Sequence, residues 1–199
     1  MKDNREELLL KIKKEVIDLK GSTLADERIK NNALTVIGEG DHHAKLMLVG
    51  EAPGKNEAEK GRPFCGASGK VLDQLFASIG MERKDAYVTN IVKDRPPLNR
   101  DPLPEEIRIY AQFLDRQIEA IKPKVIATLG RYSMIYIMQR FGLESELKPI
   151  GEMHGKIFDA KTSYGTIKIV PLYHPAVALY NGNRRPELIK DFQIIKKLL

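Results

Sequence analysis

The chain has 199 residues, enough for one domain with a sizeable hydrophobic core. It is 42% hydrophobic and 30% charged with a net charge of +6, which is ordinary for a globular protein and modestly favours a polyanionic partner. No apolar run is long enough to cross a membrane and the charged first residues do not resemble a signal peptide, so we expect a cytoplasmic protein without a membrane partner. The single cysteine, Cys65, excludes an internal disulfide and an all-cysteine metal site within one chain.

Residues 1–35 predict a helix followed by a connection. Over Glu6–Lys20 the apolar residues recur at helical spacing with lysines between them, which predicts an amphipathic helix that covers a sheet. Residues 23–44 are mostly polar and predict a connection that contains a turn. Asp41, His42 and His43 have no further ligand at metal-binding spacing, so we expect no metal there.

The stretch Leu46–Ser68 is the most informative part of the chain. Its first five residues, Leu46–Gly50, predict a buried strand, and Gly50–Gly54 break that strand into a long polar loop. The loop carries one aromatic residue, Phe64, before a helix begins near Ser68. A strand, a loop rich in Gly and Pro and then a helix is how α/β proteins place a site at the carboxyl end of a strand.

The remaining elements alternate between strands and helices. Strands are predicted over residues 86–92, 125–129 and 167–172, helices over 69–80, 104–121, 132–141 and 186–199, and a short hairpin within 142–165. This alternation predicts an α/β fold, a three-layer α/β/α sandwich around a central, mainly parallel four-stranded sheet, in a single domain over residues 1–199.

Polar residues stand where these strands end. Glu51 follows the first strand, Asn90 lies at the end of the second, and His174 follows the last. With Phe64, they suit a pocket for a flat heterocycle: a ring to stack on it, an amide to read its edge, a histidine to donate to a carbonyl and a carboxylate to order water. Each residue type alone is more often structural, and it is their common position at strand ends that favours a site.

Four motifs with these residues occur in order: Gly50-Glu51-Ala52-Pro53-Gly54, Gly61-Arg62-Pro63-Phe64, a stretch from Asn90 to Arg100, and His174-Pro175-Ala176. Together they resemble the uracil-DNA glycosylase superfamily, above all the family-four type of thermophilic bacteria and archaea, from about Val36 to Leu199. The resemblance implies a DNA repair enzyme that flips a deaminated base, foremost uracil, out of DNA and hydrolyses its N-glycosidic bond to leave an abasic site.

The resemblance also implies roles in the base pocket. Phe64 matches the aromatic residue that stacks on the flipped base, and Asn90 matches the asparagine that bonds the pyrimidine edge. His174 matches the histidine that stabilises the departing base, and Glu51 is the candidate to position the attacking water. Ala52, assigned to the pocket with Pro53, stands where the best-known members carry a catalytic aspartate.

Further residues are assigned to DNA. The loop after His174 resembles the wedge that enters the duplex, with Leu179 and Tyr180 as its apolar candidates. Gly54 and Ser68 lie where backbone amides can bind phosphate. The basic residues assigned to DNA are Lys93, Arg95, Arg184 and Arg185.

The chain departs from family four at one point. Those enzymes hold a four-iron cluster with four cysteines, one of them in a Lys-Cys-Arg-Pro-Pro sequence and one in the helix that follows. Here Asp94 and Tyr110 stand at those two places, and residues 11–32 contain no cysteine. We therefore expect no cofactor, and salt bridges, hydrogen bonds or apolar packing in its stead, such as Asp94 with a nearby Lys or Arg.

Three alternatives stay open. The same scaffold suits a glycosylase for hypoxanthine or xanthine, a catalytically silent module that binds damaged DNA, or a protein that acts on free nucleotides. No lysine is placed as a Schiff-base nucleophile, so a monofunctional glycosylase is expected. We further expect a monomer that binds DNA containing deaminated bases, associated with the nucleoid of a prokaryote, with an archaeal source as one option.

Overall fold

The computed structural model describes residues 3–199. Its centre is a six-stranded sheet in the order β1-β3-β2-β4-β6-β5. The four inner strands run parallel: β2 (Leu46–Gly50), β3 (Tyr87–Asn90), β4 (Val125–Leu129) and β6 (Gly165–Leu172). Two edge strands pair antiparallel with them: β1 (Glu39–Gly40) with β3, and β5 (Phe158–Thr162) with β6. The predicted mainly parallel sheet is confirmed, but its predicted strand number omits the two edge strands.

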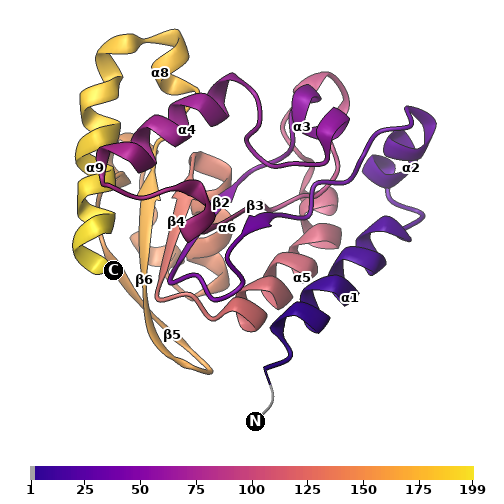
Figure 1. Cartoon of the computed structure of the whole chain (residues 1–199), viewed down its shortest axis with the longest axis horizontal. Coiled ribbons are helices and arrows are strands. Elements are labelled where there is room, and N and C mark those ends of the chain that lie inside the picture. The colour runs from indigo at the N-terminus through magenta and orange to yellow at the C-terminus, as the bar shows by residue number, and fades with distance from the viewer. Residues whose placement is uncertain (1–2) are drawn as a thin grey trace.

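Helices cover both faces of this sheet, as predicted (Figure 1). On one face lie α4 (Ala67–Ser78) and α9 (Arg185–Leu198), and on the other α1 (Arg5–Ile17), α5 (Pro104–Ile121) and α6 (Arg131–Arg140). The central strand shows why: Leu48 packs into the core beneath α4 and α9, whereas its neighbours Met47 and Val49 pack into the core beneath α1 and α5. A strand covered on both faces can be apolar throughout, as β2 is, and β4 is apolar except for Thr128.

The long helix α5 follows its sequence signals closely. It begins with Pro104, whose missing N–H costs nothing at a helix start, and the Glu106 carboxylate accepts a hydrogen bond from the Leu103 amide at 2.7 Å. Its apolar stripe packs against α1 and the sheet. The predicted bounds of this helix are confirmed.

Two helices lie where the sequence predicts only loop. Within the expected polar connection, Thr23–Lys30 forms α2, and within the expected loop after β2, Lys55–Lys60 forms α3. The short helices α7 (Ile150–Met153) and α8 (Val177–Tyr180) complete the set. Across residues 3–199 no helix is long and apolar enough to cross a membrane.

The chain changes direction between two neighbouring strands of the sheet. After β2 the chain turns to α4 on one face, whereas after β4 it turns to α6 on the other, although β2 and β4 are neighbours. Loops therefore diverge above the carboxyl ends of these two strands, which is where open α/β sheets bind their ligands.

Candidate active site

Three of the predicted site residues meet above the end of β2. Gly50 pairs with Asn90 across the sheet, and a methyl group built at Gly50 would lie 2.3 Å from Oδ1 of Asn90 and 2.7 Å from Cζ of Phe64. The ring of Phe64 lies 5.7 Å from the ring of His174 between centroids, tilted by 32°. The structure thus brings together Phe64 and His174 from two separate loops and Asn90 from the end of β3.

Asn90 is held ready for a ligand. It is 2% exposed, and its Oδ1 is buried with no hydrogen-bond partner within residues 3–199. A buried amide oxygen without a partner is costly, by about 1–3 kcal/mol, and rare in folded proteins. The Asn90 oxygen, beside the Phe64 ring, is therefore free to accept a hydrogen bond.

The backbone that presents Phe64 is strained and braced. Phe64 has a φ of +50°, and the Arg83 guanidinium donates to the carbonyl oxygens of Pro63 at 3.0 Å and Phe64 at 2.6 Å. Gly69 lies against this turn so closely that a methyl group there would be 1.6 Å from the Phe64 oxygen. These contacts fix the position of the ring.

Burial of the His174 ring keeps it neutral. Burial lowers its pKa to about 4, against a smaller opposing effect of the Glu57 charge. The Ala176 amide donates to Nδ1 at 3.2 Å, so the ring proton is on Nε2. At neutral pH His174 is therefore an uncharged donor through Nε2.

The pKa of the Glu51 carboxyl is shifted upward, whereas that of His174 is shifted downward. Burial, with a further contribution from the nearby Asp101 charge, raises the Glu51 pKa to about 7, and the Arg131 charge opposes both. Asp101 is itself held by the Tyr132 hydroxyl and lies 3.9 Å from the Arg131 guanidinium. A carboxylate with a pKa near neutrality is suited to accept a proton from water.

Sequence reasoning missed Glu57. Its Oε1 accepts hydrogen bonds from the amides of Cys65 and Gly66, both at 2.9 Å, so that α3 anchors the turn after Phe64. These bonds use amides at the start of α4 that otherwise suit a phosphate. A glutamate in a polar helix of six residues carries no pattern that would reveal this contact.

The other predicted pocket and DNA residues lie on the surface around this edge. Ala52 and Gly54 are partly exposed and Pro53 is buried between them. Ser68 lies in the first turn of α4, and the Arg95 guanidinium donates to Oδ1 of Asn99 at 2.7 Å. Their roles stay predictions.

The predicted wedge is an exposed helix, α8, above α4 and α9 (Figure 1). Leu179 is 48% exposed and Tyr180 is 89% exposed, so two neighbouring large side chains face solvent. Arg185 is exposed, whereas Arg184 is partly committed, with Nη1 at 2.8 Å from the Glu187 carboxylate and the guanidinium 5.3 Å over the Tyr173 ring.

The assignment of Lys93 to DNA is wrong. Its side chain is completely buried, and its ammonium group donates to three oxygens inside the protein. A lysine in this position cannot reach a phosphate.

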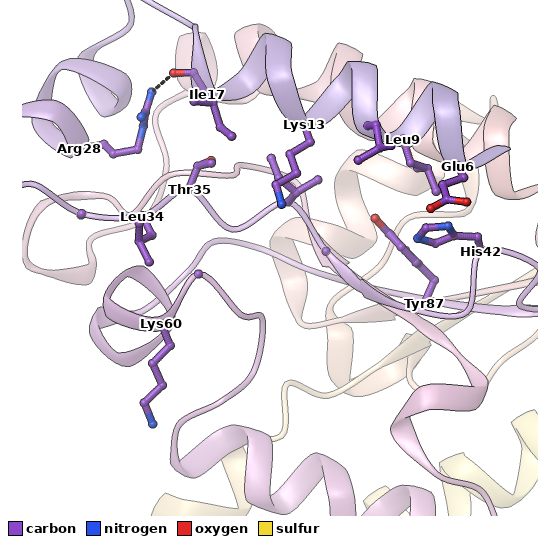
Figure 2. Close-up of a pocket in the computed structure, with 15 residues that line it drawn as sticks. Glu6, Leu9, Lys13, Ile17, Arg28, Leu34, Thr35, His42, Lys60 and Tyr87 are labelled. Atoms are coloured by element: carbon purple, nitrogen blue, oxygen red, sulfur yellow. Dashed lines mark hydrogen bonds between the residues drawn. The ribbon is translucent and has the colours of Figure 1, made fainter. Parts of the chain in front are cut away.

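A groove of about 590 Å³ lies elsewhere, between α1 and residues 33–42 (Figure 2). Leu9 and Lys13 of α1 face it from one side, with Tyr87 and His42 at one end. Tyr87 begins β3, so this groove lies away from the carboxyl ends of the strands. No residue predicted for the site lines it.

The comparisons with known proteins agree with this geometry. A model of the uracil DNA glycosylase superfamily matches residues 37–195, which contain every predicted site residue. The chain belongs to this superfamily. Three type-4 uracil-DNA glycosylases are similar to it: that of Sulfurisphaera tokodaii is 47% identical over 96% of this chain and 84% of the relative, that of Archaeoglobus fulgidus 44% over 82% and 81%, and that of Thermotoga maritima 35% over 85% of each.

The residues at the two cluster positions do not fit an iron–sulfur cluster. Such a cluster needs thiolates, whereas Oδ2 of Asp94 accepts hydrogen bonds from the Tyr110 hydroxyl at 2.7 Å and from Nε of Arg28 at 3.0 Å. Arg28 also donates to the Ile17 carbonyl at 3.0 Å. The expected link between Asp94 and a basic residue is confirmed. In this uracil-DNA glycosylase homologue, the contacts of Arg28, Asp94 and Tyr110 join four segments: the end of α1, helix α2, the loop after β3, and helix α5.

We expect Gly50→Ala to abolish most base binding while the fold persists. The new methyl group would collide with both Asn90 and Phe64, and a shift of about 1 Å in such a site can cost about 10²-fold in rate. Single-turnover cleavage and thermal unfolding should be measured beside Gly151→Ala, where the methyl group meets only the Tyr173 hydroxyl at 3.4 Å. Equal rates in the two variants would contradict the assignment of this pocket.

Proposed function

We propose that this protein is a monofunctional uracil-DNA glycosylase of DNA repair. It flips a deaminated base, foremost uracil, out of DNA and hydrolyses the bond between that base and its sugar. The observation that carries the proposal is the meeting of Phe64, the unpaired Asn90 oxygen and the neutral His174 above Gly50, with Glu51 at the same strand end.

The arrangement suits the charges that this reaction creates. When the N-glycosidic bond breaks, its electron pair goes to the base, which becomes negative, and the sugar becomes positive at C1′. His174 donates through Nε2 to a carbonyl oxygen of the base and stabilises the anion, while the Asn90 oxygen accepts from a ring N–H and orients the base. Stacking on Phe64 offsets part of the cost of extrusion, which is a few kcal/mol.

Glu51 activates the water. The oxygen of a water molecule bonds to C1′ of the sugar, and its proton passes to the Glu51 carboxylate and then to solvent. Because C1′ is already electrophilic as the bond breaks, a modest base suffices. Glu51 can therefore act although Ala52 stands where other members carry an aspartate.

The proposed partner is DNA. This DNA contains deaminated bases, and the net charge of +6 favours such a polyanion. The protein acts as a cytoplasmic, nucleoid-associated monomer. Gly54, Ser68, Arg95, Arg184 and Arg185 contact the backbone, and Leu179 and Tyr180 replace the flipped base in the stack.

The deciding experiment is single-turnover cleavage of matched oligonucleotides with uracil, hypoxanthine or xanthine, each single- and double-stranded, followed by alkali. We expect uracil release. Release of hypoxanthine or xanthine alone would show that the substrate is a deaminated purine and not uracil. DNA binding without release of any base would support the damage-binding module. His174→Ala should slow cleavage about 10²-fold or more with DNA binding retained, whereas His43→Ala, a surface histidine on the β1 side, should not.

We expect the double variant Leu179→Ala/Tyr180→Ala to slow cleavage of double-stranded substrate far more than single-stranded substrate. Only the duplex needs an apolar group to fill the space of the flipped base. The measurement is the ratio of the two single-turnover rates, with Leu10→Ala, a 58% exposed leucine on α1, as the control. An unchanged ratio would show that α8 is not the wedge.

A further inference from the structure

Lys93 is a buried lysine whose amino group lies against the backbone of Asn90. It follows β3 and is 0% exposed, and its Nζ lies 2.6 Å from the backbone oxygen of Asn90. Two more oxygens complete its surroundings, Oγ1 of Thr89 at 2.8 Å and Oε1 of Gln117 at 2.7 Å. The Lys93 ammonium group thus contacts the backbone carbonyl of Asn90, the residue whose side chain is proposed to bind the base edge.

The neighbouring hydrogen bonds match a charged ammonium group. The Thr89 hydroxyl donates to the Ile37 oxygen at 2.7 Å, and the Gln117 amide donates to the same oxygen at 2.9 Å. The oxygens of Thr89 and Gln117 are then free only to accept, as is the carbonyl of Asn90. Three acceptors meet the three hydrogens of an ammonium group.

This cation has no counter-ion. Among residues 3–199 no carboxylate lies within ion-pair distance of Lys93, and the adjacent Asp94 is committed to Arg28 and Tyr110. Burying an unpaired ion is costly, and burial lowers the Lys93 pKa well below its usual value. A negative charge formed nearby would compensate this cost, and the proposed reaction forms one on the departing base.

We propose that Lys93 is a positioning residue that stabilises the departing base anion through Asn90. Its ammonium group holds the Asn90 carbonyl and polarises that peptide group, and its positive charge favours the negative transition state over the neutral ground state. The inference rests on the proposed glycosylase function and adds a group that makes no contact with the substrate.

The test compares two leaving groups in one oligonucleotide, uracil and 5-fluorouracil, with wild type and Lys93→Met. Fluorine withdraws electrons and stabilises the departing anion, so this substrate depends less on the enzyme's charge. At saturating enzyme, well below the unfolding temperature, we expect Lys93→Met to be about 10- to 100-fold slower on uracil and clearly less impaired on 5-fluorouracil. A merely misplaced pocket would slow both substrates equally.

A second variant changes the charge balance without removing the lysine. Gln117→Glu retains an acceptor for Lys93 and supplies the missing counter-charge, at the cost of the hydrogen bond from the Gln117 amide to the Ile37 oxygen. We expect it to be slower on uracil and less affected on 5-fluorouracil. Thr128→Val, which removes another buried hydroxyl without a partner, serves as the matched control and should keep both rates.

The outcomes separate the two claims. Equal losses on both leaving groups, or rates within twofold of wild type for Lys93→Met and Gln117→Glu, would overturn the role of Lys93 while uracil release by the wild type upheld the glycosylase. No release of either base by the wild type would instead remove the proposed function itself.

Discussion

Replacing Glu51 by Gln should slow uracil release by about 10²-fold or more and at the same time stabilise the folded protein at pH 8. General-base catalysis contributes about 10²–10⁴-fold, and Gln cannot accept the proton of the attacking water. The stability gain follows because the ionised Glu51 is penalised by burial and by the Asp101 charge. Single-turnover kinetics and thermal unfolding measure the two effects on the same sample.

The raised pKa of Glu51 determines how the free energy of unfolding changes with pH. The pKa of Glu51 is raised from 4.5 to about 7 in the folded protein, so between these values the folded state holds a proton that the unfolded state releases. The free energy of unfolding contributed by Glu51 therefore falls as pH rises through this window. The unfolding temperature of Glu51→Gln should exceed that of the wild type by an amount that grows from pH 4.5 to 7 and is constant above.

The pH dependence of the cleavage rate should also report the ionisation of Glu51. The wild-type rate should rise with pH to a plateau above about 7, where Glu51 is ionised in the free enzyme. Asp101→Asn removes a charge that raises the Glu51 pKa, so its plateau should begin at lower pH. Glu59→Gln, an exposed glutamate on α3, is the control and should leave both profiles unchanged. A rate independent of pH from 5 to 8 would exclude Glu51 as the base.

The centre of the fold was predictable because burial on both faces leaves a simple pattern. The strands Leu46–Gly50 and Val125–Leu129 are five-residue segments, apolar apart from Thr128, with matching bounds in the structure. The polar residues that follow such runs collect at one sheet edge whenever the strands are parallel. For this reason Asn90 and His174 could be placed together without any knowledge of loop geometry.

The missed features all depend on contacts between distant segments. Helix α3 buries only Ala58 and so has no apolar stripe. Glu57 gains its role only when the turn after Phe64 folds back on it. Lys93 beside a proline-rich loop suggests a solvated charge, and only the approach of Gln117 from α5 provides the acceptor that allows its burial.

We expect Asp94→Ala to lower the free energy of unfolding by about 3–5 kcal/mol, the usual cost of breaking a buried ion pair. The Asp94 side chain is 0% exposed and that of Arg28 is 10% exposed. Removing the carboxylate leaves the Arg28 charge and the Tyr110 hydroxyl buried without their partner. Tyr110→Phe, which removes only one hydrogen bond, should cost about 1–3 kcal/mol. Chemical denaturation of each variant gives these values.

A double variant separates the need for this ion pair from the need to fill its volume. Replacing a buried pair by apolar residues of similar size is often neutral or stabilising, so Asp94→Leu/Arg28→Met should regain much of the stability that Asp94→Leu alone loses. Recovery would mean that the cost lies in the orphaned charge. No recovery would mean that the bond from Arg28 of α2 to the Ile17 carbonyl at the end of α1, at 3.0 Å, is needed to hold these two helices together. In either case the contacts of Arg28, Asp94 and Tyr110 occupy the region where family-four relatives would hold a cluster, and this chain has no thiolates there to bind one.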